Sequence, residues 1–270
     1  MSFVVAVAQR KGGCGKTTLA ATLAATSVSR AFHTGTVDLD SQANLSRWAL
    51  GREAVDGLLH LQSVAALEWP IRTEAVEFGS PLLQAKSEAE LLEIVLPHCV
   101  HESPTVRGLK VIPCAPHIHP EEARSLAIES LPFDVAIIDT PPDVSGWAVR
   151  SVLRQANAVI APVVCDPWAV DGVEQLLREI VSVGRGDLID RGLVRFVLNL
   201  RQKTALADRL ENEIRRLWGD LVCSVVIPRA VAIAEASISP ELLTKKHALW
   251  KAGLGIWADL DKTLKKRGAA

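Results

Sequence analysis

The sequence predicts an α/β fold in three layers, with a mostly parallel twisted sheet and helices on both of its faces. Short apolar runs of strand length recur along the 270 residues, and most are continuous rather than alternating, which is typical of strands buried on both faces. Longer segments with helical spacing separate these runs. Because strands and helices alternate, the pattern favours parallel pairing through right-handed crossovers.

Each element is predicted from its hydrophobic pattern. The expected strands, most of them rich in Val and Ile, are Phe3–Ala8, Thr36–Leu39, Leu109–Pro113, Val135–Asp139, Ala158–Val164, Leu193–Leu200 and Leu221–Ile227. The expected helices are Thr17–Arg30, Ala89–Leu96, Glu121–Ser130, Trp147–Gln155, Val170–Val183, Ala205–Trp218 and Leu242–Leu264.

The chain is expected to form a single domain over residues 1–270, since its length gives a prior of one or two domains at ~150 residues each. Hydrophobic residues make up 49% of it, which is enough apolar surface for a core. Residues 51–108 carry scattered Pro, Gly and charges, and are expected to form a less regular insertion. A basic C-terminal helix is expected at about 240–266.

Composition limits the classes of partner and the compartment. The formal net charge is −1, so any nucleic acid or anionic lipid must be met by a local basic patch. The five cysteines are widely spaced and contain no C-x-x-C pair, which argues against a disulfide framework and against a zinc site. We expect a cytoplasmic protein, because no secretory leader and no apolar run of ~18 residues is visible.

The strongest motif is RKGGCGKTT at residues 10–18, between a predicted buried strand and a predicted helix. Three glycines let consecutive backbone N–H groups surround an anion at the helix N-terminus: Gly12, Gly13 and Gly15. Lys16 is expected at the β and γ phosphates, Thr17 on Mg²⁺, and Thr18 at the α phosphate. A glycine-rich turn without a ligand is the alternative, but Lys and Thr in register favour a P-loop NTPase.

The loop departs from the usual P-loop pattern, since Arg10 stands where Gly is common and Lys11 precedes Gly12. The segment KGGCGKTT resembles the deviant phosphate loop of the ParA/MinD family of ATPases, in which the early lysine is the signature residue. The resemblance implies ATP as cofactor and a homodimer that encloses two ATP molecules. It also implies that Lys11 acts on the partner's phosphates, so Lys11 and Lys16 are the expected catalytic lysines. Cys14 is interpreted as a small apolar filler, with a redox-sensitive thiol as the alternative.

The segment Asp38-Leu39-Asp40-Ser41-Gln42 resembles the Asp-x-Asp-Pro-Gln segment of that family, whose second Asp orients the attacking water. Asp40 takes that role by resemblance and is also expected near the metal. A carboxylate just beyond a parallel strand also faces the ligand crevice of an open α/β sheet. Asp38 is expected to contact the phosphate loop or the metal shell. An N-cap for a helix starting near Ala43 is the alternative for Asp40 or Ser41.

The strand Val135–Asp139 is followed by Thr-Pro-Pro and resembles the Walker B strand and second switch of the family. Asp139 is therefore expected to hold Mg²⁺ through a water, since this ion keeps several waters. By resemblance, Pro228 and Arg229 are candidates for the adenine pocket. Asn199 is a further candidate for the base edge, with a turn or cap as the alternative. The resemblance covers residues 1–50 and about 109–236.

The C-terminal segment carries a local basic excess. From Pro240 onward, seven Lys or Arg stand against three acids, an excess of four positive charges. These charges suit contacts to DNA phosphates, and Arg201, Arg215, Arg216 and Arg229 could extend the patch. A solvated helix face is one alternative. A membrane-surface helix is another, with an apolar stripe formed by Trp250, Leu254, Trp257 and Leu264.

The resemblance therefore implies a ParA-like ATPase with weak intrinsic activity. It would dimerise on ATP, bind DNA nonspecifically in the nucleoid, and segregate or position a plasmid, chromosome region or other cargo. A ParB-like or other cargo-bound activator protein would stimulate hydrolysis and release. A MinD-like ATPase on the membrane surface and an accessory ATPase of a synthesis or secretion complex remain alternatives, and a membrane partner is not expected.

Overall fold

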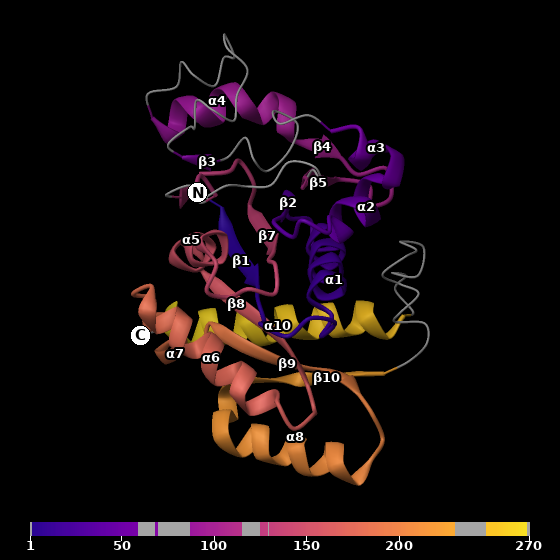
Figure 1. The fold of residues 1–270 in the computed structure, drawn as a ribbon, viewed down its shortest axis with the longest axis vertical. Helices are drawn as coiled ribbons and strands as arrows, with labels where there is room; N and C mark the ends of the chain where they lie inside the picture. Colours follow the sequence, from indigo (N-terminus) through magenta and orange to yellow (C-terminus); the bar gives the residue numbers. More distant parts are fainter. Residues whose placement is uncertain are drawn as a thin grey trace.

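The computed structural model describes residues 2–58, 68–69, 87–114, 125–128, 130–229 and 247–268. Ten strands lie in these ranges: β1 (Phe3–Val7), β2 (Thr34–Asp38), β3 (Glu68–Trp69), β4 (His101–Glu102), β5 (Leu109–Ile112), β6 (Ser125–Leu126), β7 (Val135–Asp139), β8 (Ala158–Val164), β9 (Val194–Arg201) and β10 (Val222–Pro228). Eight of them form one sheet in the order β10-β9-β8-β1-β7-β2-β5-β4 (Figure 1). Every neighbouring pair in this sheet is parallel except β4 with β5. The expected α/β fold with a mostly parallel sheet is confirmed.

Helices fill the connections between the strands. They are α1 (Lys16–Ser29), α2 (Asn44–Leu50), α3 (Arg52–Asp56), α4 (Glu88–Cys99), α5 (Trp147–Gln155), α6 (Ala169–Ser182), α7 (Asp187–Asp190), α8 (Ala205–Trp218) and α10 (Ala248–Gly268), with a 3₁₀ turn at Gly219–Leu221. The predicted bounds of α5 and α8 are confirmed to the residue. At α8, the side chain of Thr204 accepts a hydrogen bond from the Ala207 N–H and so caps the helix where the turn ends.

Two of the long helices share one face of the sheet. α1 packs on β1, β2 and β7, and α10 packs on both α1 and β10 (Figure 1). Gly253 allows the close crossing of α10 over α1, since a Cβ there would lie 2.7 Å from the Thr26 hydroxyl oxygen. Right-handed crossovers place α5, α6 and α8 on the opposite face, and α5 and α6 contact β1 and β8 respectively.

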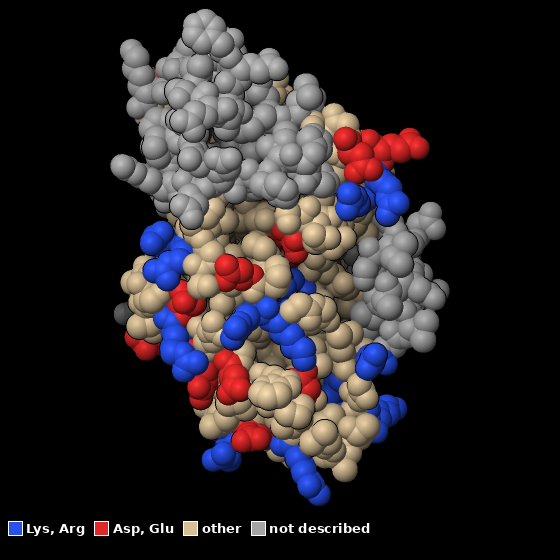
Figure 2. Space-filling view, viewed as in Figure 1, with Lys and Arg blue, Asp and Glu red and all other residues tan. Residues whose placement is uncertain are grey.

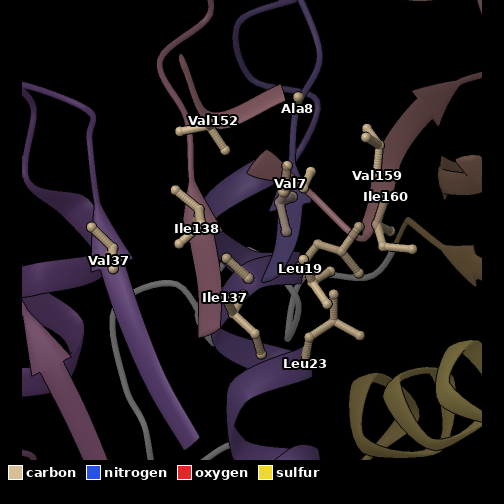
Figure 3. Close-up of a cluster of buried hydrophobic side chains, with 14 of the residues drawn as sticks. Val7, Ala8, Leu19, Leu23, Val37, Ile137, Ile138, Val152, Val159 and Ile160 are labelled. Carbon is tan, nitrogen blue, oxygen red and sulfur yellow. The ribbon is translucent and has the colours of Figure 1, made fainter. Parts of the chain in front are cut away.

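The core lies between the central strands and the helices that cover them. Leu19 and Leu23 of α1 lie beside Val7 and Ile137 of the sheet, and all four are at most 1% exposed (Figure 3). All five residues of β2 and all five of β7 are buried. The continuous apolar runs of the sequence therefore correspond to strands covered on both faces.

The expected helix over Glu121–Ser130 is wrong where the structure describes it. Residues 125–126 form β6 and pair with β3 in an antiparallel two-stranded sheet, while 121–124 and 129 lie outside the described residues. Side chains of α5 satisfy this backbone, because the Leu126 N–H donates to Ser151 Oγ at 2.9 Å and the Ile128 N–H donates to Gln155 Oε1 at 3.1 Å. Hydrogen-bond acceptors on α5 therefore take the place of the backbone carbonyls that a helix would have supplied from its own turn.

Two other regions were expected only in outline. Within residues 51–108, the described part contains α3, α4, β4 and the residues at β3, and β4 lies at one edge of the large sheet. The basic helix begins at Ala248 in the described residues and continues to Gly268, while residues 240–246 lie outside them.

Candidate functional site

The glycine-rich loop connects the end of β1 to the start of α1. Gly13 and Gly15 have φ values of +70° and +91°, in the left-handed region that favours glycine. At Gly15 the space is also closed, because a Cβ would lie 2.4 Å from the Nδ2 atom of Asn199. The glycines were expected from the motif, and the close approach to Asn199 was not.

The first turn of α1 carries the residues expected at the phosphates. Lys16 is the first helical residue and is 6% exposed, and Thr17 and Thr18 follow it. The helix contains no acidic residue in its first turn, so its N-terminal N–H groups and Lys16 give this end of the loop positive character. The arrangement is suited to bind a phosphate chain.

Asp139 lies at the carboxyl end of β7, opposite Val7 of β1 and Asp38 of β2 in the strand register. It is fully buried, and neither carboxylate oxygen has a hydrogen-bond partner in the part of the chain that the structure describes. Burial raises the pKa of Asp139 well above its ordinary value, and the Asp38 charge adds to the rise. The Thr17 hydroxyl and the Lys16 ammonium act in the opposite direction on this pKa.

Two unpartnered carboxylate oxygens fit the divalent cation that the sequence implied. Mg²⁺ prefers oxygen ligands and leaves room for waters, so Asp139 with the Thr17 hydroxyl can contribute to such a site. Within the described ranges, no group of three or more His, Cys, Asp or Glu side chains is arranged to hold a metal ion. A cation held by few protein ligands agrees with both observations.

Asp38 was expected to contact the phosphate loop or the metal shell, and its hydrogen bonds address the first of these alternatives. Its Oδ2 accepts hydrogen bonds from the Ser46 N–H at 2.8 Å and the Ser46 hydroxyl at 2.6 Å, and its Oδ1 accepts from the Asp40 N–H at 3.1 Å. Burial raises the pKa of Asp38 to about 6, although the hydrogen bonds from Ser46 and Asp40 act to lower it. Asp38 therefore contacts the start of α2 rather than the phosphate loop, and its carboxylate fixes the backbone of Asp40.

Asp40 lies in the turn between β2 and α2. Its Oδ1 accepts a hydrogen bond from the Gln42 N–H at 2.9 Å, and its carbonyl accepts from the Ala43 N–H at 2.8 Å. Ala43 precedes α2 with a φ of +50°, and no side chain caps that helix. The alternative interpretation of Asp40 or Ser41 as an N-cap is therefore wrong.

Lys11 lies at the surface, unlike Lys16, and 43% of its side chain is exposed. Its ammonium forms an ion pair with Asp166, which lies in the connection from β8 to α6. The neighbouring Arg10 donates to Gln175 Oε1 of α6 at 2.5 Å. The start of the phosphate loop is therefore attached to the α6 side of the molecule.

Asn199, at the end of β9, is 3% exposed and lies against the phosphate loop. Its Nδ2 donates a hydrogen bond to the Cys14 carbonyl at 2.7 Å, while its Oδ1 is buried without a partner among the described residues. Pro228 is the last residue of β10, one strand further out, and Arg229 follows it. Both are exposed, and the Arg229 N–H bonds to the Arg201 carbonyl at 2.9 Å.

Cys14 itself is 1% exposed. Burial raises the pKa of its thiol, and the nearby Lys16 offsets this only in part. A buried thiol with a raised pKa is a poor nucleophile, so the observation favours the small apolar filler over the redox-sensitive alternative.

One side of the helix α10 is buried and the other is exposed to solvent. Trp257 is 4% exposed, and its indole N–H donates to the Leu23 carbonyl at 3.3 Å. Trp250 is half-buried, and Leu254 and Leu264 remain exposed. The apolar stripe of the membrane-surface alternative is therefore partly used in packing on α1. No helix in the described ranges is long and apolar enough to cross a bilayer.

Two functional neighbours escaped the sequence analysis, Asp166 and Ser46. Asp166 precedes a proline after a buried strand, which signals a turn but not a contact with Lys11. Ser46 lies in a predicted helix, where a serine carries no motif. The Lys11 contact joins residues 155 apart and depends on β8 lying next to β1, whereas Ser46 follows Asp38 by only eight residues but matches no motif.

The fold and the phosphate loop together define a nucleotide-binding protein of the P-loop class. Residues 5–243 match the family model described as the CobQ/CobB/MinD/ParA nucleotide binding domain. The chain belongs to this family.

Individual relatives agree with the family match. The chain is 30% identical over 234 residues to the chromosome-partitioning ATPase Soj of Thermus thermophilus, covering 86% of this chain and 83% of that protein. It is similar in structure to a plasmid partition protein of Borrelia burgdorferi bound to AMPPNP, with a TM-score of 0.71, 17% identity and coverage of 97% and 99%. A cobyrinic acid a,c-diamide synthase of Mycobacterium smegmatis with bound ADP and magnesium gives a TM-score of 0.60 at 22% identity, with coverage of 90% and 93%. At these identities the two structures establish the fold.

Proposed function

We propose that the chain is a ParA-type partition ATPase that binds ATP and Mg²⁺, dimerises around two nucleotides, binds DNA nonspecifically and releases it on hydrolysis. The observation that carries the proposal is the difference in exposure between the two lysines of the loop. Lys16 is buried at the start of α1, and Lys11 is exposed beside it, bound to Asp166. A lysine exposed at the loop surface is available to a second subunit.

In this proposal the nucleotide's own subunit supplies most of the site. The loop glycines and Lys16 hold the phosphates, and Thr18 lies at the α phosphate. Thr17 and Asp139 would hold the metal, Asp139 through a water, with Asp40 nearby. Its chemistry when bound is to neutralise the charge of the β and γ phosphates. Asp40 orients the attacking water, and its backbone is already held by Asp38.

The adenine is assigned to the loop edge beyond β9 and β10. Asn199 Oδ1 is a buried acceptor without a partner among the described residues, and it suits the 6-amino group of adenine. Pro228 and Arg229 are proposed to border the base.

The second subunit supplies Lys11. Crossing the dimer interface, its ammonium would offset the charge that develops on the transferring phosphoryl group, as an arginine finger does. The exposed ion pair with Asp166 opposes this movement little, since surface ion pairs contribute about 0–1 kcal/mol.

DNA binding is assigned to the solvent face of α10. Lys251, Lys262 and Lys265 are all exposed there and recur at helical spacing along one stripe. Of the arginines expected to extend this patch, Arg201 and Arg215 each form an ion pair with Glu211. By family similarity, the proposal also includes a cargo that is moved and an activator protein of ParB type.

Mixing two defective chains tests the shared site. Lys11→Ala removes the group supplied in trans, and Asp40→Ala removes the group supplied in cis. Each variant alone is expected to lose ATPase activity. In a mixed dimer, the nucleotide of the Lys11→Ala chain receives Asp40 from its own chain and Lys11 from the other. Equal mixing should restore about a quarter of the wild-type rate, because half of random dimers are mixed and each has one complete site.

The control mixture combines Asp40→Ala with Lys16→Ala, which is expected to lose nucleotide binding and so to restore nothing. If the first mixture hydrolyses ATP no faster than its two components separately, Lys11 does not act across an interface and the proposed dimer is wrong. Sedimentation of the Asp40→Ala chain with ATP should also give a persistent dimer.

A further inference from the structure

We infer that Trp168 anchors the second copy of this chain in the ATP-bound dimer. Its indole would pack on the partner beside the nucleotide site. The inference rests on the proposed dimer and adds a residue that the phosphate-loop motif does not contain. Among the exposed large hydrophobic residues of the described ranges, Trp168 has the greatest exposure, 71%.

The position of Trp168 follows from the parallel sheet. It lies four residues beyond the end of β8, and β8 is the parallel neighbour of β1. The loops that follow two parallel neighbours leave the sheet at the same edge. The loop carrying Trp168 therefore lies beside the phosphate loop.

Contacts between the two loops make them one surface. Lys11 is bound to Asp166, Arg10 to Gln175, and a Cβ on Gly172 would lie 3.4 Å from Gln9 Oε1. The same Asp166 that binds Lys11 through Oδ2 accepts a hydrogen bond from the backbone N–H of Trp168 through Oδ1 at 3.0 Å. One carboxylate thus binds both the ammonium of the proposed trans-acting lysine and the backbone of the residue that carries the exposed indole.

The exposure of Trp168 is not a consequence of a loose loop. The Ala169 N–H donates to the Asp166 carbonyl at 3.0 Å, and the Gly172 N–H donates to the Trp168 carbonyl at 3.2 Å, as α6 begins. A rigid aromatic side chain loses little conformational entropy on association, and Trp is enriched among the residues that dominate interfaces.

The occupant that fits best is a second copy of the chain. If Lys11 reaches the nucleotide of a partner, the partner must lie over the surface that contains Lys11, and Trp168 shares that surface through Asp166. The surface carries both signs of charge, since Lys11 pairs with Asp166 there. In the middle of the face drawn in Figure 2, Lys and Arg side chains likewise lie close to Asp and Glu side chains. A surface that carries both signs of charge can pair with a copy of itself about a two-fold axis. Each of the two Trp168 side chains would then pack against the opposite subunit.

The test compares dimer dissociation constants in AMPPNP and Mg²⁺ by sedimentation over a concentration series. Trp168→Ala is expected to raise the dissociation constant at least about tenfold, since two anchors are lost per dimer. Trp168→Phe should lie between that variant and the wild type. The matched control is Leu206→Ala on α8, a 56% exposed apolar residue, which should leave the constant unchanged.

A fluorescent ATP analogue, titrated onto dilute monomer, separates the interface from the nucleotide pocket. Trp168→Ala should bind it as the wild type does, which also shows that the variant is folded. If the wild-type chain dimerises and Trp168→Ala has the same dimer dissociation constant, this inference alone is overturned, and the indole serves a different partner. A wild-type chain that stays monomeric with AMPPNP would overturn both this inference and the proposed dimer.

Discussion

Asn199 illustrates how a single side chain determines the shape of the phosphate loop. Its amide holds the Cys14 carbonyl, and its Nδ2 occupies the space that a side chain at position 15 would need. The carbonyl of a phosphate loop must turn away from the anion so that the N–H groups can face it. Asn199 is the partner that such a carbonyl requires when it is buried.

Asn199→Ala is therefore expected to weaken ATP binding at least about threefold, because it removes both the Cys14 contact and the proposed contact of Oδ1 with adenine, each the equivalent of a neutral hydrogen bond. Isothermal titration with AMPPNP measures the change. Asn212→Ala on the exposed surface of α8 is the control and should bind as the wild type does. Equal affinities for Asn199→Ala and the wild type would mean that the loop keeps its shape without the Cys14 contact and that Oδ1 does not bind adenine.

At the scale of elements, α8 is attached to the sheet by charged hydrogen bonds. Glu211 accepts from Arg201 Nε of β9 at 2.9 Å and from Arg215 Nε at 3.0 Å. Burial alone would raise the pKa of Glu211, but the hydrogen bonds from Arg201 and Arg215 lower it below its ordinary value of 4.5. The folded state therefore favours the ionised form more than the unfolded state does.

The sign of the pH dependence follows from that lowered pKa. The stabilisation by Glu211 is complete above pH 4.5 and is lost as the pH falls through its lower folded pKa. At neutral pH, Glu211→Gln should reduce the free energy of unfolding by about 1–2 kcal/mol, and the difference from wild type should shrink in acid. Urea unfolding across this pH range measures it.

Glu213→Gln is the matched control for this prediction, because Glu213 is exposed on the same helix. Its effect should be small at every pH, as for most surface substitutions. If the Glu211→Gln difference stays constant from neutral to acid pH, the carboxylate charge is not the source of the stabilisation.

At the scale of the whole molecule, the near-zero net charge bears on the proposed binding of DNA. The formal net charge of −1 provides no overall attraction to phosphates, so the proposal requires the exposed lysines of α10 to act locally. The opposite side of the helix is already packed, with Ile256, Trp257 and Leu260 buried. Packing on α1 and β10 thus leaves a basic stripe for solvent and removes much of the stripe that a membrane would need.

The triple variant Lys251→Ala, Lys262→Ala and Lys265→Ala should weaken DNA binding in the presence of ATP. The slope of log affinity against log salt should fall by about 2–3, since each phosphate contact contributes about 0.9. Gel retardation over a salt series measures both quantities. The control removes three other surface charges, with Arg52→Ala, Arg107→Ala and Arg178→Ala, and should leave the slope unchanged.

Local patterns were sufficient for the parts of the protein that depend on neighbours in the sequence. Continuous apolar runs predicted the buried strands β1, β7 and β8, and the loop at 10–18 with its flanking elements predicted the P-loop class and the family. Helical periodicity predicted α5 and α8 to the residue. It was wrong at Ser125–Leu126, because the hydrogen-bond partners of this backbone come from α5 rather than from its own turn.

By itself, therefore, the sequence determined the class of site, since a phosphate loop needs its glycines, lysine and threonine in one short run. Only the tertiary structure decided which distant residues complete it. Asn199 meets Cys14 across 185 residues and Lys11 meets Asp166 across 155, because the order of strands in the sheet brings their ends to one edge. Contacts of that kind depend on which strands become neighbours, and no local pattern records that choice.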